Sequence, residues 1–473
     1  MEQYICITLG PVFDTINLAS SPAALWTGSY LFSYLSKTIC RTLTKYNVPE
    51  NDIISPYYTD GEDQPENSDG VGLYHDRIVF RQGKFPFSDF DQVRQDAIEH
   101  VADTFRLPAE YLKEYFLIRA VQCESDSPII DSTKALDCLE LNKPLPAPRS
   151  DNPLLELLVG KEHFGNERIK QLPLTKGFTN WHLRKNNGSL KSVSDISGEF
   201  WNTGMKKHHY YAIVRADGDH MGDIISSLHP DQMRDFSKKC IFYCAQIAAD
   251  VAAYGGVTIY SGGDDLLAIM PCENRQGKNV LEFAQEANET FKAAFAQFSE
   301  SVSLSFGITI CYNRFPLYEA LEDSQNMLFG AAKSKRNCVA IHIQKHSGQT
   351  ACLVIANDAL PSLIDFYKTN ISPECSQWIR SAHHALHNFR MLFQQAGDDP
   401  VRIKNLFMNL FDADSHRGNE FLHTALREFY CKLLTELDIT HVDDQNDSGK
   451  IDTLVSILRF LKFFTEKEGE RND

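Results

Sequence analysis

The spacing of apolar residues divides the first 125 residues into short strands and longer helices. The apolar run at residues 4–9 ends at Gly10-Pro11, and helical spacing begins at about Pro22. The acidic segment 59–68 is almost free of apolar residues and predicts a loop. The predicted elements are strands at 4–9, 53–57 and 77–80 and helices from 22 and at 89–105. Their order is β-α-β-β-α.

The same order returns from residue 210 with clearer signals. The helix predicted at 233–251 carries a continuous apolar stripe, and a second amphipathic helix follows the central strands. The predicted elements are strands at 210–216, 257–260, 266–270, 304–311 and 339–343 and helices at 233–251, 283–298 and from 316. This is a ferredoxin-like βαββαβ unit with one further αβ pair. Beyond about residue 360 the pattern is entirely helical.

These patterns predict an α+β chain with two ferredoxin-like palm domains, a helical bridging module and a C-terminal α-helical bundle. A chain of 473 residues is too long for one hydrophobic core. The expected domains are a first palm at 1–124, the bridging module at 125–205, a second palm at 206–348 and the bundle at 349–473. We expect the bundle to serve as an interaction surface.

Composition restricts the possible function classes. A formal net charge of −16 argues against a protein that coats nucleic acid unaided, because neutralising phosphates needs clustered Lys and Arg. The chain shows neither a signal-peptide pattern nor the ~18 uninterrupted apolar residues of a membrane span, so we expect a soluble, cytoplasmic protein without membrane contact. The twelve cysteines contain no CxxC pair, which predicts reduced thiols.

Two acidic clusters stand at predicted strand ends in the second palm. Asp217-Gly218-Asp219 ends its first strand, and Asp264-Asp265 occupies the turn between its central strands. Because the first and third strands of a ferredoxin-like sheet are neighbours, the clusters should face each other. Carboxylates are the ligands that Mg²⁺ or Mn²⁺ prefers, and paired ions can activate a 3′-hydroxyl and stabilise leaving pyrophosphate. Alone, Gly-Gly-Asp-Asp could be a hairpin turn and Asp-Gly-Asp a loop or part of a calcium site, but their joint occurrence favours a metal site.

Other residues near these clusters fit the same chemistry. Gly262 and Gly263 leave room where a base or ribose would approach, and backbone N–H groups at His220-Met221-Gly222 could hold phosphates. Lys333 could add a charge to a triphosphate, or could be only a helix-end cation. The pairs His75-Asp76 and His208-His209 lack surrounding ligands in sequence and are interpreted as structural.

These motifs resemble the large polymerase/cyclase-like subunit of type III CRISPR effector complexes. The resemblance rests on two segments. Residues 210–222 contain Ala216-Asp217-Gly218-Asp219-His220-Met221-Gly222, and residues 260–265 are Tyr-Ser-Gly-Gly-Asp-Asp. Segments 7–12, 25–31 and 33–35 are similar to the opening of the first palm in the Cmr-type branch. The resemblance extends from residue 5 to about residue 343.

The resemblance implies a nucleotidyltransferase that makes an adenylate second messenger from ATP, normally a cyclic oligoadenylate, when guide RNA pairs with target RNA. It implies the other complex subunits as partners, with RNA reached mainly through the complex. Asp217, Asp264 and Asp265 would be the catalytic metal ligands. The residues expected to bind nucleotide or acceptor are Gly218, Asp219, His220, Met221, Gly222, Ser261, Gly262, Gly263, Lys333 and Asp69.

Two departures from the family pattern bear on the activity. The first palm starts within a few residues of Met1, which suggests a short form without the HD nuclease domain, and the family's zinc-binding cysteine cluster is missing. Short relatives include a group that joins ATP to S-adenosylmethionine. The positive charges of that acceptor would favour carboxylates such as Asp69 in the first palm, although the acidic segment could instead be a solvated loop.

Other function classes remain as alternatives. The chain could be a catalytically silent scaffold, but its acidic set is intact. A free-standing GGDEF-type cyclase is disfavoured by Asp265 where that family usually has Glu, by the duplicated palm and by the lack of an attached sensor. A template-dependent polymerase would need a broad basic channel, which the net charge of −16 disfavours.

Overall fold

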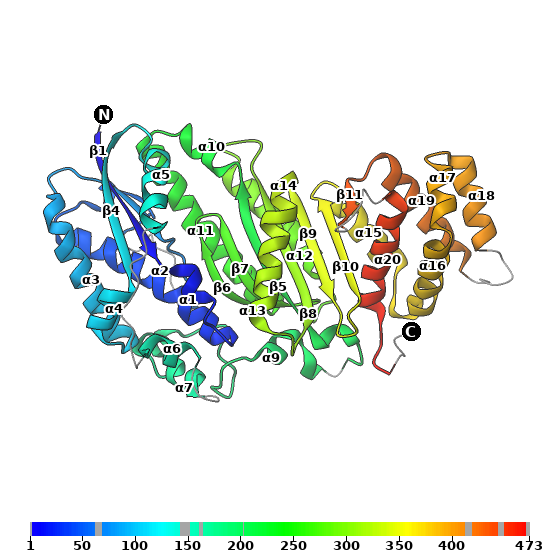
Figure 1. The fold of residues 1–473 in the computed structure, drawn as a ribbon, viewed down its shortest axis with the longest axis horizontal. Helices are drawn as coiled ribbons and strands as arrows, with labels where there is room; N and C mark the ends of the chain where they lie inside the picture. Colours follow the sequence, from blue (N-terminus) through cyan, green and yellow to red (C-terminus); the bar gives the residue numbers. More distant parts are fainter. Residues whose placement is uncertain are drawn as a thin grey trace. The chain divides into compact units, whose positions relative to one another are not determined.

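The computed structural model describes residues 2–61, 69–141, 152–159, 164–201, 203–411, 419–442 and 449–469, so most of the predicted acidic loop 59–68 lies outside the described residues. The chain forms two compact units built from interleaved segments (Figure 1). Unit 1 comprises Met1–Val193, His220–Ile269 and Thr290–Val302, and unit 2 comprises Ser194–Asp219, Met270–Glu289 and Ser303–Asp473. The four-domain division proposed from the sequence stays a prediction.

Unit 1 contains a four-stranded antiparallel sheet with the ferredoxin-like order β2-β3-β1-β4. The strands are β1 (Glu2–Gly10), β2 (Ile53–Ser55), β3 (Arg77–Arg81) and β4 (Leu117–Ser125), and β1 pairs with both β3 and β4. Helices α2 (Pro22–Lys45) and α3 (Phe90–Phe105) pack against each other. The predicted β-α-β-β-α order is confirmed, and β4, which the sequence pattern did not reveal, completes the palm.

Shorter helices surround this palm. They are α1 (Val12–Ile16), α4 (Ala109–Tyr115), α5 (Pro128–Leu141), α6 (Pro153–Leu158), α7 (Phe164–Lys170) and α8 (Pro173–Gly177). An aromatic cluster joins α2 to the segment after α8. Trp26 stacks on Tyr30 with ring centroids 4.8 Å apart, and its ring lies 4.7 Å from that of Trp181.

The first long helix of the second palm packs on the first palm. This helix, α11 (Pro230–Tyr254), follows α10 (Met221–Ser226), and its predicted apolar stripe is buried. The Tyr57 amide donates to Ser237 Oγ at 2.8 Å, and Arg234 donates to the Tyr58 carbonyl at 3.2 Å. Strands β6 (Val257–Gly262) and β7 (Asp265–Pro271) follow as an antiparallel hairpin. These contacts explain why α11 and β6 belong to the same compact unit as the first palm.

Unit 2 contains a run of strands in the order β11-β10-β9-β8-β5. These are β5 (Tyr210–Asp219), β8 (Ser303–Tyr312), β9 (Cys338–Gln344), β10 (Thr350–Ala356) and β11 (Ile439–His441). β5 pairs antiparallel with β8, β8 parallel with β9, and β9 antiparallel with β10. The other elements of the second palm are α9 (Val193–Ser197), α12 (Val280–Phe295), α13 (Leu317–Gln325), a π-helix (Asn326–Ala332) and α14 (Lys333–Lys335). The sequence pattern predicted β5, β8 and β9 but not β10.

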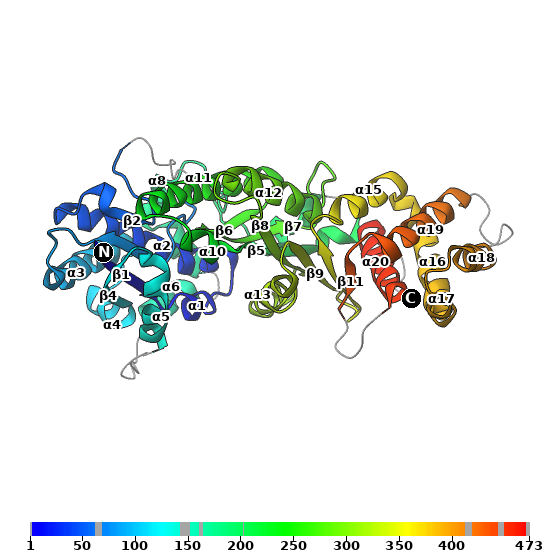
Figure 2. The same cartoon turned by 90° about the horizontal axis from the view of Figure 1, so that it is seen from above.

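The C-terminal helices are α15 (Leu360–Asn370), α16 (Ser376–Asn388), α17 (Arg390–Ala396), α18 (Pro400–Leu410), α19 (Glu420–Thr435) and α20 (Lys450–Thr465). Three of them, α16, α17 and α19, pack against the buried helix α20, while α15 packs on α19 and α18 on α17 and α19 (Figure 2). The prediction of one helix at 376–394 is wrong at Phe389, which separates α16 from α17. The prediction that everything beyond 360 is helical is wrong at β11, because residues 439–441 pair with β10.

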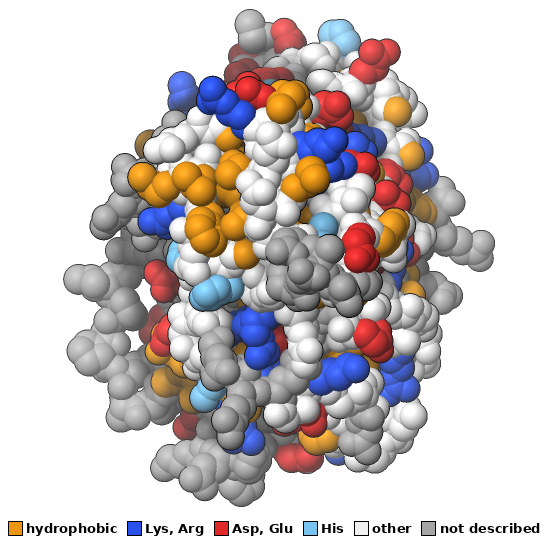
Figure 3. Space-filling model, turned by 90° about the vertical axis from the view of Figure 1, so that its right-hand side faces the viewer, with side chains coloured by type: hydrophobic (Ala, Val, Ile, Leu, Met, Phe, Trp, Pro, Cys, Tyr) orange, Lys and Arg blue, Asp and Glu red, His pale blue; other side chains and the backbone are white. Residues whose placement is uncertain are grey.

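Large apolar side chains of these helices reach the surface. Figure 3 shows a face on which hydrophobic side chains gather beside Lys and Arg. The exposed large hydrophobic side chains between 389 and 421 are Phe389, Met391, Leu392, Val401, Met408 and Phe421. This exposure is compatible with the interaction surface expected for the bundle, which stays a prediction.

The cysteines form no disulfides. All twelve are free, as expected, and only Cys138 is exposed. No helix in the described ranges is both long and apolar enough to cross a bilayer.

Candidate active site

Asp219 is a buried carboxylate at the end of β5, and its side chain has no solvent exposure. The register of β5 on β8 places Asp219 opposite Ser303 and Asp217 opposite Ser305. Asp219 accepts hydrogen bonds from Ser303 Oγ at 2.8 Å and from Ser305 Oγ at 2.9 Å. The Asn337 amide donates to it at 2.9 Å and Lys333 Nζ at 3.1 Å. Four donors therefore hold this carboxylate in place, and the nucleotide contact expected of Asp219 stays a prediction.

Asp217, two residues earlier on the same strand, is more open. Its side chain is 21% exposed, and one oxygen lies 3.1 Å from Lys333 Nζ. Lys333 also donates to the carbonyl of Gly218 at 2.6 Å. The structure thus brings Asp217, Gly218, Asp219 and Lys333 together. Lys333 is held by the strand end, and the contact with a triphosphate expected from the sequence stays a prediction.

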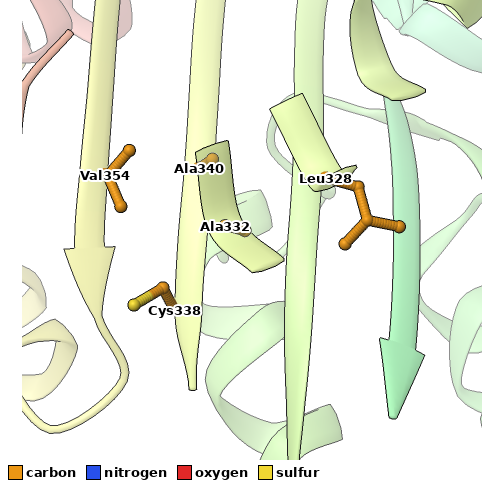
Figure 4. Close-up of a cluster of buried hydrophobic side chains, with 5 residues drawn as sticks. All are labelled: Leu328, Ala332, Cys338, Ala340 and Val354. Carbon is orange, nitrogen blue, oxygen red and sulfur yellow. The ribbon is translucent and has the colours of Figure 1, made fainter. Parts of the chain in front are cut away.

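A π-helix places Lys333 above the strands. This segment, Asn326–Ala332, leads directly into Lys333 and rests on β8 and β9. Its Leu328 and Ala332 side chains belong to a buried cluster with Cys338, Ala340 and Val354 (Figure 4). Such π-turns often occur at functional sites.

Gly307 of β8 allows this close approach. A Cβ at position 307 would lie 2.4 Å from the Leu328 amide nitrogen and 2.5 Å from the Ser324 carbonyl oxygen. Both are backbone atoms that cannot easily move aside. Gly307 therefore determines how closely the lysine-bearing segment packs on the sheet.

The acidic turn joins β6 and β7 in unit 1. Gly262 pairs with Asp265 across the hairpin, which leaves Gly263 and Asp264 as a two-residue loop. Gly263 has a φ of +71°, and glycine is favoured at the first position of type II′ turns. Asp264 is half-buried and Asp265 is exposed, whereas Ser261 is fully buried.

Buried groups anchor this turn from behind. The Ser261 amide donates to the Gly72 carbonyl at 3.1 Å, and its hydroxyl donates to the Cys244 carbonyl at 3.2 Å. Burial raises the pKa of the Cys244 thiol to about 12, and the carboxylates of Asp264 and Asp265 act in the same direction. Ser261 thus fixes the position of the turn.

Part of the first palm lies beside the turn. A Cβ on Gly263 would lie 4.0 Å from the ring of His75. Burial lowers the pKa of His75 to about 4, with a smaller contribution from Arg77, so its ring is neutral at pH 7. Its Nε2 lies 3.0 Å from Ser55 Oγ, and its Nδ1 accepts from the Arg77 amide at 3.4 Å. Burial, and after it Asp265 and Asp76, raises the pKa of Tyr260 well above its usual value.

The predicted phosphate-binding junction follows β5. His220 has a φ of +61° and precedes α10, and its Nδ1 lies 3.1 Å from Asp223. Met221 is buried. Gly222 faces open space, because a Cβ there would meet no atom within 4 Å. This junction is accessible, and phosphate binding by it stays a prediction.

Asp69, the predicted acceptor-side carboxylate, lies next to the aromatic cluster of unit 1. Its oxygen is 4.0 Å from His182 Nε2, and its side chain is 32% exposed. Trp26 Nε1 donates to the neighbouring Gly70 carbonyl at 2.6 Å. A Cβ on Gly70 would lie 2.8 Å from Phe178, so this position needs glycine.

The predicted site residues thus form two groups. Asp217, Gly218, Asp219 and Lys333 meet in unit 2, while the turn 261–265 belongs to unit 1. In the described part of the chain, no three His, Cys, Asp or Glu side chains are arranged to hold a metal. Sequence reasoning missed the donors Ser303, Ser305 and Asn337. Two serines at alternate positions in an otherwise apolar strand were the signal that could have revealed the first two.

The comparisons with known proteins agree with the two palms. Residues 210–340 match the family described as Cas10/Cmr2, second palm domain, and residues 4–101 match CRISPR-associated protein Cmr2, N-terminal. The CRISPR system Cmr subunit Cmr2 of Pyrococcus furiosus is 31% identical over 170 residues. That alignment covers 29% of this chain and only 19% of the relative.

Solved structures resemble almost the whole chain. A crystal structure of a Csm1-Csm4 cassette in complex with cA4 has a TM-score of 0.60 at 12% identity, covering 98% of this chain and 70% of that chain. A cryo-EM structure of the type III-B Cmr-beta apo state has a TM-score of 0.57 at 12% identity. The match covers 97% of this chain and 81% of that chain. At this identity the similarity shows the fold, and it confirms the predicted α+β palm architecture.

Proposed function

We propose that this chain, which carries the Cmr2 N-terminal and the Cas10/Cmr2 second palm domains, is a metal-dependent nucleotidyltransferase that uses ATP. One observation carries the proposal: the carboxylates differ in availability. Asp219 is fully buried and held by four donors, whereas Asp217, Asp264 and Asp265 keep contact with solvent. The three carboxylates that stay at least partly exposed are those that the sequence motifs mark as metal ligands.

The first palm supports the proposed meeting of the two acidic groups. In its sheet the first strand, β1, pairs with the third, β3. The same order in the second palm would place β5 beside β7. Asp217 and the turn at Asp264 would then share one edge of the sheet. This arrangement is part of the proposal.

The donor set fits a hard divalent cation, because Mg²⁺ and Mn²⁺ prefer carboxylate oxygens completed by water and phosphate. Asp217, Asp264 and Asp265 would hold it. When bound, the metal would supply positive charge for the leaving pyrophosphate and lower the pKa of the attacking hydroxyl. Lys333 orients Asp217 through the 3.1 Å contact. A Cβ on Gly222 would meet no atom within 4 Å, so the backbone at this position is open to a phosphate.

The proposed product is an adenylate second messenger, a cyclic oligoadenylate, formed by attack of a 3′-hydroxyl on the α-phosphorus of ATP with release of pyrophosphate. The cA4-bound cassette that resembles this chain supports an adenylate ligand for the fold. We propose that synthesis takes place within a type III CRISPR complex and starts when target RNA pairs with the guide RNA.

Mass analysis of products tests this function. The assembled complex is incubated with target RNA, Mg²⁺ and ATP. Asp264→Ala with Asp265→Ala is expected to abolish synthesis without loss of assembly, and Asp217→Asn to reduce it strongly. Glu289→Gln, an exposed carboxylate on α12, is the matched control and should leave synthesis unchanged. Synthesis that persists in the double variant would exclude this site, and a wild-type complex that assembles without synthesis would favour the silent scaffold.

A second candidate function is conjugation of ATP with S-adenosylmethionine. The observation that favours it is Asp69, a carboxylate whose side chain is 32% exposed and whose neighbour Gly70 accepts a hydrogen bond from Trp26. A carboxylate attracts the positive charges of sulfonium and ammonium groups.

The acceptor is identified by adding S-adenosylmethionine to the same reaction. Under this candidate function, the product gains the mass of the acceptor, and Asp69→Asn prevents that gain while oligoadenylate synthesis continues. A product mass that is the same with and without S-adenosylmethionine would discard conjugation.

A further inference from the structure

A basic cavity of about 420 Å³ lies in unit 2, where the turn between β9 and β10 meets helices α16 and α20. Its charged lining consists of Lys345, Arg380, Arg459 and Lys462, with His383 and His384 beside them. Among the described residues, no Asp or Glu lines this cavity. The concentration of positive charge is notable because the chain as a whole carries a net charge of −16.

One carboxylate near the cavity offsets part of this charge. Glu466 is buried, accepts a hydrogen bond from Lys345 at 3.1 Å, and lies 3.7 Å from Lys462. Burial lowers the pKa of Lys345, and Lys462 acts in the same direction while Glu466 opposes it. Arg459 forms no ion pair with a carboxylate in the described ranges. No Asp or Glu among these residues therefore neutralises its charge.

Arg459 and His383 are arranged for an anion. Arg459 Nε donates to His383 Nε2 at 3.0 Å. An N–H cannot donate to another N–H, so Nε2 carries no proton and Nδ1 carries it. Burial lowers the pKa of His383 to about 4, and Arg459, His387 and Lys462 add to the effect. At pH 7 the ring is therefore a neutral donor that adds no further charge.

Arg459 lines a cavity with other cations and has no ion pair with a carboxylate among the described residues, so an anion bound there would stabilise the folded chain. The size of the cavity lies within the ~300–1,000 Å³ typical of ligand pockets. Arg and Lys together are the side chains that proteins use to bind phosphate. The cavity therefore fits an anion that carries phosphate.

A neighbouring hollow adds aromatic groups. It is lined by Tyr312, Arg314, Phe315 and His346, and it shares Lys345 with the basic cavity. The rings of Tyr312 and His346 lie 5.0 Å apart. Nucleic-acid bases stack on such rings while Lys and Arg contact the backbone. The two hollows together match a phosphate with an attached nucleoside.

We propose that this cavity is a second anion-binding site, separate from the acidic palm site, and that it binds the phosphate of a nucleotide unit. The unit is supplied either by single-stranded RNA or by a free nucleotide. Arg380, Arg459 and Lys345 bind the phosphate, and the aromatic hollow receives the base.

Binding measurements on the full chain test the proposal. The probes are a labelled single-stranded RNA, ATP and inorganic phosphate, all in EDTA so that metal-dependent binding at the palm does not contribute. Arg380→Gln with Arg459→Gln is expected to weaken binding about tenfold for each arginine. Arg459→Lys keeps the charge and should stay within about threefold of wild type. Arg402→Gln, whose side chain on α18 is 68% exposed, is the matched control.

The probes distinguish the two sources. Tight binding of RNA identifies a polynucleotide, and the slope of its salt dependence should then fall by about 0.7 for each phosphate that the variants no longer bind. Tight binding of ATP with weak binding of RNA identifies a free nucleotide. The proposal is overturned if wild type binds none of the probes, or if the double variant binds them as wild type does. No outcome depends on nucleotide synthesis, so this test is independent of the proposed function.

Discussion

Replacing Asp219 with asparagine should separate the structural carboxylate of β5 from the proposed catalytic one. The carboxylate of Asp219 accepts from Ser303, Ser305, Lys333 and the Asn337 amide in a fully buried position. An asparagine has only one side-chain acceptor oxygen. Its NH₂ group would replace the second carboxylate oxygen and could not accept hydrogen bonds from the donors that surround it. Lys333 would lose a buried counter-charge. Breaking a buried charge pair costs about 3 to 5 kcal/mol, so we expect the free energy of unfolding to fall by about that amount.

Asp217→Asn is the matched comparison on the same strand. Its side chain is 21% exposed, and its ion pair with Lys333 is partly solvated, so we expect a loss of less than about 1.5 kcal/mol. Urea unfolding of the full chain, followed by circular dichroism, measures both variants, and product mass analysis measures synthesis. Asp217→Asn should fold and lose synthesis. A destabilisation below about 1 kcal/mol for Asp219→Asn would refute the structural role assigned to this carboxylate.

Three further predictions follow from local geometry. Gly307→Ala places a Cβ against the backbone of Ser324 and Leu328 and should cost about 1 to 3 kcal/mol in urea unfolding, whereas Gly330→Ala, which meets no atom within 4 Å, should not destabilise. Burial holds the pKa of His208 at about 4, below its unfolded value, so the unfolded chain binds more protons between about pH 6.5 and pH 4. The free energy of unfolding, measured by urea unfolding at each pH, should therefore fall between about pH 6.5 and pH 4. The fall should be about 1 to 2 kcal/mol smaller in His208→Gln than in the wild-type chain. Equal falls in the two proteins would contradict the burial of a neutral His208. In thiol labelling of the native chain Cys138 should react first, while Cys240 and Cys244, buried and with raised pKa values, should react only after unfolding. Fast native labelling of Cys244 would contradict the buried anchor of the acidic turn.

Sequence patterns predicted the strongly periodic elements well. The stripe of α11 is buried because each of its apolar residues faces the same side, and β8 was recognisable because nearly all of its residues are buried. β4 was missed because it is an edge strand in which Arg119 is partly exposed and Gln122 and Glu124 are exposed. β11 has only three residues and forms through its pairing with β10, which local spacing cannot show.

The site could be located from the sequence, but the roles within it could not be separated. Asp217 and Asp219 are two residues apart and lie on the same face of β5. The alternation of residues along the strand therefore does not distinguish one carboxylate from the other. Their difference arises from Ser303 and Ser305, which lie about 85 positions further along the chain, and from the helix end that carries Lys333. The alternating serines are visible in the sequence, but their pairing with Asp219 depends on the register of β5 on β8, which local patterns do not show.

The hydrogen bond from the Ser261 amide to the Gly72 carbonyl has a mechanical consequence. It ties the strand that leads into the acidic turn to the same segment that carries Asp69 and His75. Gly72 is packed closely against α2, because a Cβ on this residue would lie 2.9 Å from the side chain of Ser33. A ligand that displaces this segment must stretch or break that bond. Under the second candidate function, a ligand bound beside Asp69 would therefore be coupled to the position of the acidic turn through this one backbone hydrogen bond.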